Sequence, residues 1–104
     1  MYIKPRIMYF GSPSCDRCIK YYTKLKEMIV LDRNNFTFIN GDDFKNKEIQ
    51  DLCDKHNVDE YPHVKIYILD KCIYEEIGEL NLQEICRQMD IRINPENASK
   101  YTTG

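Results

Sequence analysis

The chain has 104 residues, of which 42% are hydrophobic and 31% charged, and its formal net charge is −2. This length and composition predict one domain with one modest core. The charges form no block of one sign, which argues against a nucleic-acid surface, and the apolar stretches are too short to span a membrane. The N-terminus has no apolar region with a small-residue cleavage site, so we expect an unexported, cytoplasmic protein.

The first part of the chain alternates between strand and helix patterns. Residues 6–10 are apolar and aromatic and end at Gly-Ser-Pro, which predicts a buried strand and a tight loop. From Cys18 onward apolar residues recur at helical spacing, so we expect an amphipathic helix that ends near Asp32. Residues 36–40 alternate and are rich in aromatic and β-branched side chains, which predicts a second strand.

The middle of the chain predicts a short helix and a hairpin. The helix begins after Asp43 or Asn46, both of which are N-cap residues, and ends near Asn57. Two strands follow, at 63–69 and 72–78. Because their connection is so short, these strands must run antiparallel.

The last predicted helix follows Asn81, an N-cap residue with Glu84 three positions on. Its apolar stripe consists of Leu82, Ile85, Cys86 and Met89. Residues 94–104 have no apolar period and predict a flexible C-terminal tail after a domain of residues 1–93. The order β-α-β-α-β-β-α predicts an α/β fold with a four-stranded mixed sheet, its first two strands parallel, flanked by helices on both faces.

Two of the five cysteines, Cys15 and Cys18, stand three positions apart at a predicted helix start. The free N–H groups and the helix dipole favour an anion there. We therefore expect Cys15 to be the nucleophilic thiolate, and Cys18, one turn into the helix and more covered, to be the resolving thiol. Arg17 is expected to favour the thiolate and Asp16 to oppose it, while Pro13 shapes the preceding loop.

The spacing of Cys15 and Cys18 is also compatible with other roles. A structural zinc site needs four ligands, whereas the remaining candidates, Cys53, His56, His63 and Cys72, are scattered along the chain. The pair could also simply fill space. Cys53 and Cys86 are expected to be buried packing thiols. We expect His63 either to lie near the thiols or to face solvent.

Three spaced segments together resemble the thioredoxin family: "CDRC" at a helix start, "HNVDEYPHVKIYI" about forty residues later, and "IGELNLQEI". The resemblance covers roughly residues 5–92. It implies a thioredoxin-like fold and a thiol–disulfide oxidoreductase with a redox-active disulfide Cys15–Cys18 and no bound cofactor. It also implies that Pro62 follows a cis bond and lies beside Cys15, and that the backbone of Tyr61 is free to pair with an extended client segment.

The chain departs from the thioredoxin pattern in several places. It has no Trp, and Tyr9 stands where thioredoxins carry a buried Asp, so the proton-handling role of that Asp is not available. A glutaredoxin-like, glutathione-dependent reductase is an alternative, although only Gly78 remains of the Gly-Gly pair of that family. Another is a non-catalytic binding module with the same fold.

The expected partners follow from the resemblance. They are disulfide-containing client proteins and an external electron donor, such as a thioredoxin reductase or glutathione. We expect no nucleic-acid or membrane partner, and a monomer.

Overall fold

The computed structural model describes residues 1–102 and has the predicted order of elements. The strands are β1 (Arg6–Gly11), β2 (Phe36–Asn40), β3 (His63–Ile68) and β4 (Lys71–Ile77). The helices are α1 (Asp16–Met28), α2 (Lys47–Lys55) and α3 (Leu82–Met89). None of the helices in residues 1–102 is long and apolar enough to cross a membrane.

The four strands form one mixed sheet in the order β2-β1-β3-β4. β1 and β2 run parallel, and β3 is antiparallel to both β1 and β4. The predicted α/β class, the parallel first pair and the terminal hairpin are thereby confirmed. The central position of β1 and β3 was not predicted; it places Phe10, near the end of β1, opposite His63 at the start of β3.

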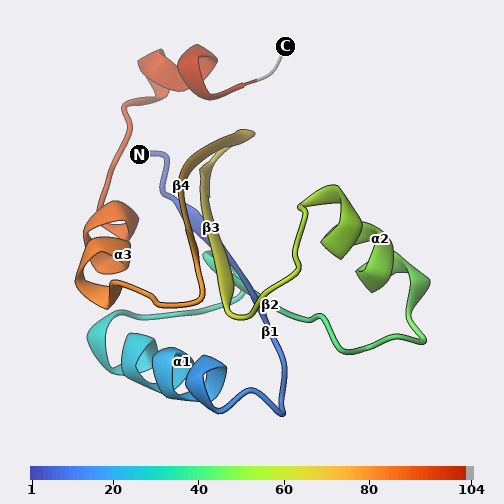
Figure 1. The fold of residues 1–104 in the computed structure, drawn as a ribbon. Coiled ribbons are helices and arrows are strands. Elements are labelled where there is room, and N and C mark those ends of the chain that lie inside the picture. The colour runs from blue at the N-terminus through green and yellow to red at the C-terminus, as the bar shows by residue number, and fades with distance from the viewer. Residues whose placement is uncertain (103–104) are drawn as a thin grey trace.

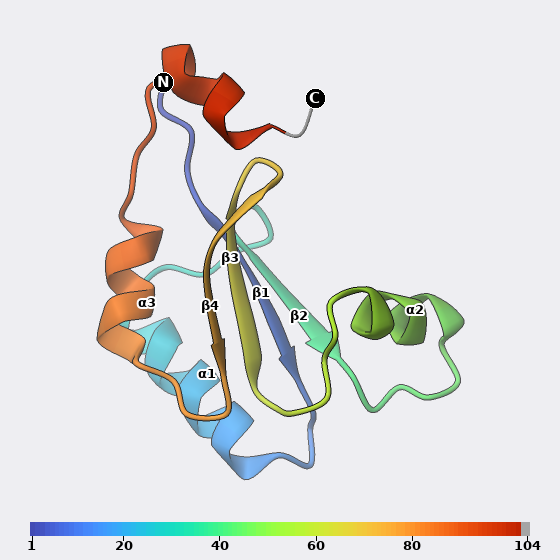
Figure 2. The ribbon, with the colours of Figure 1, turned by 45° about the horizontal axis from the view of Figure 1, so that its top comes forward.

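Helices cover both faces of the sheet, as predicted: α1 and α3 lie on one side and α2 on the other (Figures 1 and 2). Alternate residues of β1 serve the two sides, because successive strand side chains point in opposite directions. Tyr9 packs in one core cluster with Leu25 of α1 and Ile85 of α3. Phe10 packs in a second cluster with Cys53 of α2.

Each helix begins at a residue whose side chain accepts a hydrogen bond from the backbone N–H three positions on. These N-cap residues are Cys15, Asn46 and Asn81. Such caps satisfy N–H groups that have no partner within the helix. Of the two candidates for the second helix, Asn46 is the cap. Asn57, the predicted terminator of that helix, has a positive φ of 55°.

The C-terminal segment differs from its prediction. Residues Pro95–Tyr101 form a 3-10 helix, η1, where the sequence predicts no regular structure. The helix is set by local chemistry rather than by an apolar period, because Asn94 caps it and Pro95 is favoured in a first turn. The Tyr101 carbonyl accepts the N–H of Asp70 at 2.9 Å, which ties η1 to the β3–β4 turn. The flexibility of this tail and the domain boundary at residue 93 stay predictions, and residues 103–104 lie outside the described residues.

Candidate functional site

The loop before α1 is a tight turn that presents Cys15. The N–H of Cys15 donates to the Ser12 carbonyl at 3.1 Å, with Pro13 at the second position of the turn, where its fixed φ is favoured. Ser12 is buried, and its hydroxyl bonds the carboxylate of Asp42. Ser14 joins the same group, with its hydroxyl 2.9 Å from that of Ser12. The loop is thus anchored to the segment that follows β2.

Cys15 and Cys18 are joined by a disulfide, with their Cα atoms 5.3 Å apart. Cys15 is the N-cap of α1, as predicted, and its sulfur accepts the N–H of Cys18 at 3.3 Å. Cys15 is partly exposed, whereas Cys18 is completely buried. The pair is therefore asymmetric, because a reagent from solvent can reach only the first sulfur. Within residues 1–102 no group of three or more His, Cys, Asp or Glu side chains is placed to hold a metal ion.

The loop before β3 lies beside the start of α1. The Tyr61–Pro62 peptide bond is cis, and Pro62 is buried. The Pro62 carbonyl accepts the N–H of Gly78 at 2.8 Å, so the loop is also held by the end of β4. This loop also contacts the first turn of α1 through Arg17, so three chain segments meet there.

Arg17 makes the direct connection between the cysteine segment and this loop. Its Nε and Nη2 donate to the Tyr61 carbonyl at 2.8 and 2.5 Å, and Nη2 also lies 3.2 Å from a carboxylate oxygen of Glu60. The expectation that the Tyr61 backbone is free is therefore wrong for its carbonyl. The guanidinium of Arg17 is directed at Tyr61 and Glu60, while Asp16 is exposed as the first residue of α1. Residues 17 and 61 are 44 positions apart, and no sequence signal pairs them.

Gly41 is a residue of the site that the sequence analysis missed. A Cβ atom at this position would overlap the ring of Tyr61, so only glycine leaves the ring its place. Burial, followed by the nearby Cys53 and Asp42, raises the pKa of the Tyr61 hydroxyl. The ring of Tyr61 is thus positioned by Gly41, in the segment after β2. No sequence pattern indicated this role for Gly41.

Tyr9 lies under the disulfide helix, where thioredoxins carry an acid. It is fully buried, and its hydroxyl donates to the Cys18 carbonyl at 2.7 Å. Its ring stacks on Phe38 with the ring centres 5.7 Å apart. Burial raises the pKa of the Tyr9 hydroxyl well above its ordinary value. The side chain therefore stays protonated at neutral pH and serves as a fixed hydrogen-bond donor rather than a base.

Both expectations for His63 are wrong. The side chain is buried rather than facing solvent, and it lies on the α2 side of the sheet, 5.8 Å from the ring of Phe10. The thiols lie on the α1 side. Its Nε2 is 2.7 Å from a carboxylate oxygen of Glu75, and this hydrogen bond lowers the pKa of Glu75. His63 therefore belongs to a polar group beneath α2 and not to the cysteine site.

The three remaining cysteines differ in burial. Cys53 is buried, as predicted for a packing thiol, and Cys86 is only partly buried. Burial raises the pKa of both thiols, so neither is activated as a thiolate. Cys72 is exposed on β4. None of the three forms a disulfide within the described residues.

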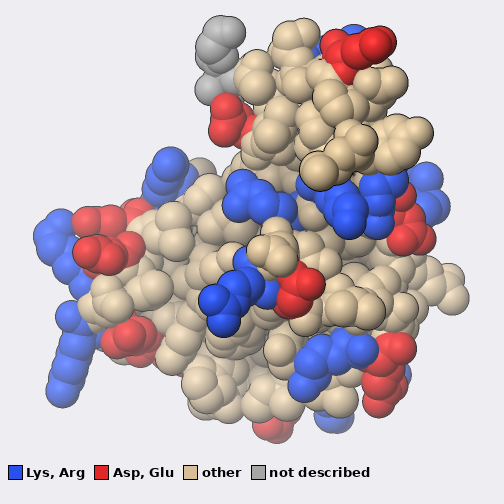
Figure 3. All heavy atoms as spheres, turned by 180° about the vertical axis from the view of Figure 1, so that it is seen from behind, with Lys and Arg blue, Asp and Glu red and all other residues tan. Residues whose placement is uncertain are grey.

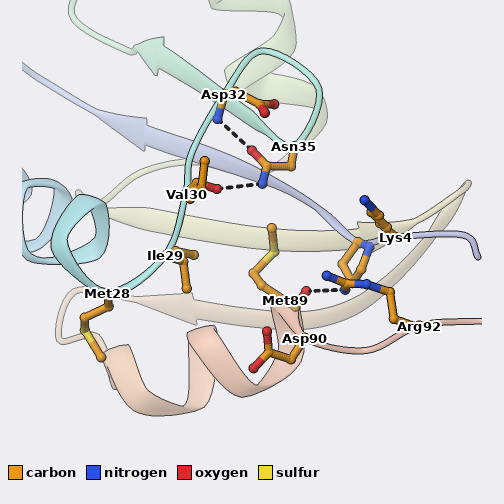
Figure 4. A pocket seen from close by; sticks show the side chains of 10 residues that line it. Lys4, Met28, Ile29, Val30, Asp32, Asn35, Met89, Asp90 and Arg92 are labelled. Atoms are coloured by element: carbon orange, nitrogen blue, oxygen red, sulfur yellow. Dashed lines mark hydrogen bonds between the residues drawn. The ribbon is translucent and has the colours of Figure 1, made fainter.

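A pocket of about 450 Å³ lies at the far end of α1 (Figure 4). It is lined by Met28 and Ile29 at the end of that helix, by Met89 at the end of α3, and by charged side chains of both signs, Lys4, Asp32, Asp90 and Arg92. In its wall, the Asn35 side chain donates to the Val30 carbonyl at 2.9 Å. A helix of 13 residues is about 20 Å long, so this pocket is separate from the disulfide.

On the face seen from behind in Figure 3, basic and acidic side chains are interspersed rather than gathered by sign.

Comparisons with known proteins place the fold. No protein-family model and no curated protein matches the chain. Among solved structures, thioredoxin f2 of Chlamydomonas reinhardtii is 16% identical with a TM-score of 0.62, over 81% of this chain and 74% of that one. The germline-specific thioredoxin Deadhead of Drosophila melanogaster is 15% identical with a TM-score of 0.61, over 84% and 79%. The first thioredoxin domain of mouse protein disulfide-isomerase A4 is 20% identical with a TM-score of 0.56, over 97% and 73%.

The chain has the thioredoxin fold. The predicted fold is thereby confirmed, including the β-α-β-α-β-β-α order of its first seven elements.

Proposed function

We propose that this protein is a thiol–disulfide oxidoreductase that exchanges disulfides with client proteins through Cys15 and Cys18. The observation that carries the proposal is the asymmetry of the pair. Cys15 is partly exposed at a helix N-cap with a backbone N–H on its sulfur, while Cys18 is covered. An N–H donor and the positive end of a helix stabilise a thiolate at this position. Cys15 is therefore the attacking sulfur and Cys18 the resolving one.

The proposed reaction runs in two exchanges. The Cys15 thiolate attacks one sulfur of a client disulfide; a bond forms to Cys15, the client S–S bond breaks, and one client thiolate leaves. Cys18, as thiolate, then attacks the Cys15 sulfur, which closes the Cys15–Cys18 disulfide and releases the second client thiolate. Two electrons have passed to the client. An external thiol donor, such as a thioredoxin reductase or glutathione, must return two electrons to the protein.

The loop of Tyr61 and Pro62 is the proposed client-binding element. It lies next to the helix start that carries the disulfide, joined to it through Arg17. Tyr61 lies outside β3, so no strand of the sheet pairs with its backbone, and a client segment could add there once Arg17 leaves the Tyr61 carbonyl. The reaction needs no bound cofactor, and we propose a monomer that acts in the cytoplasm, as the sequence predicts.

A binding module is the second candidate, and two observations favour it. The Tyr61 carbonyl is closed by Arg17, and Tyr9 replaces the acid that would handle a proton. A protein that docks without exchanging disulfides needs neither a free Tyr61 carbonyl nor a buried acid. The accessible Cys15 favours the enzyme.

Insulin reduction tests the enzyme directly. The oxidised protein is supplied with NADPH and a thioredoxin reductase, or with glutathione and glutathione reductase, and precipitation of the reduced insulin chains is followed. We expect turnover that Cys15→Ser abolishes and that the matched control Cys72→Ser, at an exposed thiol, leaves intact. The donor that supports turnover distinguishes a thioredoxin-like from a glutaredoxin-like reductase. Absence of turnover with either donor would favour the binding module.

A further inference from the structure

The Tyr61 carbonyl oxygen, with which a client backbone would pair, already accepts hydrogen bonds from Arg17. A carbonyl oxygen has two lone pairs, and Arg17 directs two N–H groups at that of Tyr61, from Nε at 2.8 Å and from Nη2 at 2.5 Å. No strand bond uses this oxygen, because β3 begins two residues later. A client segment that pairs with Tyr61 must therefore displace the guanidinium first.

The side chain that must move is half-exposed and held on its other side by a carboxylate. Arg17 and Glu60 are 46% and 56% exposed, with Nη2 and Oε1 3.2 Å apart. Such an exposed pair contributes little to stability, so Glu60 holds the guanidinium only weakly. No hydrogen bond joins Nη1 of Arg17 to another residue of the described chain, which leaves that nitrogen for an incoming acceptor.

The surface beside Arg17 carries further positive charge. A groove of about 490 Å³ runs from Arg17 along the outer side of α1, lined by Lys20 and Lys24 and by the exposed side chain of Ile19. Glu27 is the only acidic residue among those lining this groove. A client carboxylate that reached Arg17 would find Lys20 one helical turn away in the same groove, and a guanidinium pairs with a carboxylate through two parallel hydrogen bonds.

We propose that Arg17 is a specificity-determining residue that favours client proteins with Asp or Glu next to the reacting disulfide. An acidic client gives the displaced Arg17 guanidinium a carboxylate with which it forms two hydrogen bonds. A neutral or basic client displaces Arg17 from the Tyr61 carbonyl and offers it no carboxylate in return. This inference rests on the proposed function, since it concerns which disulfides reach Cys15.

Matched peptide substrates test the inference. Two disulfide-linked peptides differ only in whether the residue flanking the disulfide is Glu or Gln, and kcat/KM is measured for the wild type, Arg17→Gln and Arg17→Lys. We expect the wild type to prefer the Glu peptide by about threefold, the order expected of one partly exposed ion pair. Arg17→Gln should lose this preference, with equal kcat/KM on the two peptides, and Arg17→Lys, which cannot form the fork, should retain only part of it.

A matched control separates local recognition from net charge. Arg33→Gln removes the same charge from an exposed arginine outside the site, and should keep the wild-type preference. An equal rate of the wild type on the two peptides, or an unchanged preference in Arg17→Gln, would overturn the inference while leaving the proposed function intact. If the wild type reduces neither peptide, the proposed function itself is contradicted, and the inference falls with it.

Discussion

The variant Tyr9→Phe should change the unfolding free energy without changing the pH dependence of disulfide reduction. The substitution keeps the buried ring and removes only the hydroxyl that donates to the Cys18 carbonyl at 2.7 Å. That carbonyl also lies within α1 and keeps its helical N–H donor. Loss of one buried hydrogen bond without an orphaned partner costs about 1 kcal/mol of unfolding free energy. In a domain of this size that corresponds to a fall of about 4 °C in the melting temperature.

Although Tyr9→Phe should lower stability, we expect it to leave the pH dependence of the reaction unchanged. Because the pKa of Tyr9 is raised well above its ordinary value, the hydroxyl carries its proton throughout the working range and accepts none. The pH dependence of insulin reduction should therefore match that of the wild type. Tyr9→Asp, which restores the acid of thioredoxins, should instead cost about 4 kcal/mol, because it leaves a cavity and a buried carboxyl in a site shaped for a ring.

Urea unfolding of the oxidised proteins and insulin reduction from pH 6 to 9 provide the two readouts. An unchanged unfolding free energy in Tyr9→Phe would refute the reasoning about the hydrogen bond. A shifted pH profile would show that Tyr9 takes part in proton transfer. A Tyr9→Asp variant as stable as the wild type would show that the site tolerates the acid.

Three further substitutions test other parts of the account. Glu75→Gln removes a carboxylate whose pKa is lowered by its hydrogen bond with His63. Glu75 therefore adds stability above its unfolded pKa and loses it as pH falls through the folded value, so the variant should be less stable at pH 7 and match the wild type near pH 3 in urea unfolding. Asn81→Ala removes the cap of α3 and should cost about 1 kcal/mol in the same assay; a cost near zero would mean that the cap does not hold the helix. Gly41→Ala places a methyl group where the ring of Tyr61 lies, and should slow insulin reduction without touching either cysteine; wild-type kinetics would show that the position of Tyr61 does not matter.

The elements could be predicted because their signals are local. Residues 36–40 alternate over five positions, and the Asn81 cap acts within one helical turn, so the pattern and the structure coincide there. The 3-10 helix at Pro95–Tyr101 was missed because it buries no apolar stripe that a periodicity could reveal. The burial of His63 was missed because it depends on Phe10, a residue of a strand that becomes a neighbour only in the sheet.

The site could be predicted in part for the same reason. The N-cap position of Cys15 follows from the pattern of the helix that it starts. The contact of Arg17 with Tyr61 depends on the order of strands in the sheet, which brings residues 44 positions apart together. Composition and spacing do not reveal such a contact, so Arg17 was predicted to stabilise the Cys15 thiolate rather than to bind the Tyr61 carbonyl.

The central claim is that Cys15 is the attacking sulfur of a redox-active pair. Cys18→Ser, reduced and mixed with insulin or a disulfide-linked peptide, tests it by intact mass and peptide mapping. We predict a covalent mixed disulfide on Cys15 that dithiothreitol releases, and no adduct on Cys18 when Cys15→Ser is treated in the same way. No adduct on Cys15, or equal adducts on the two cysteines in the single variants, would contradict the account.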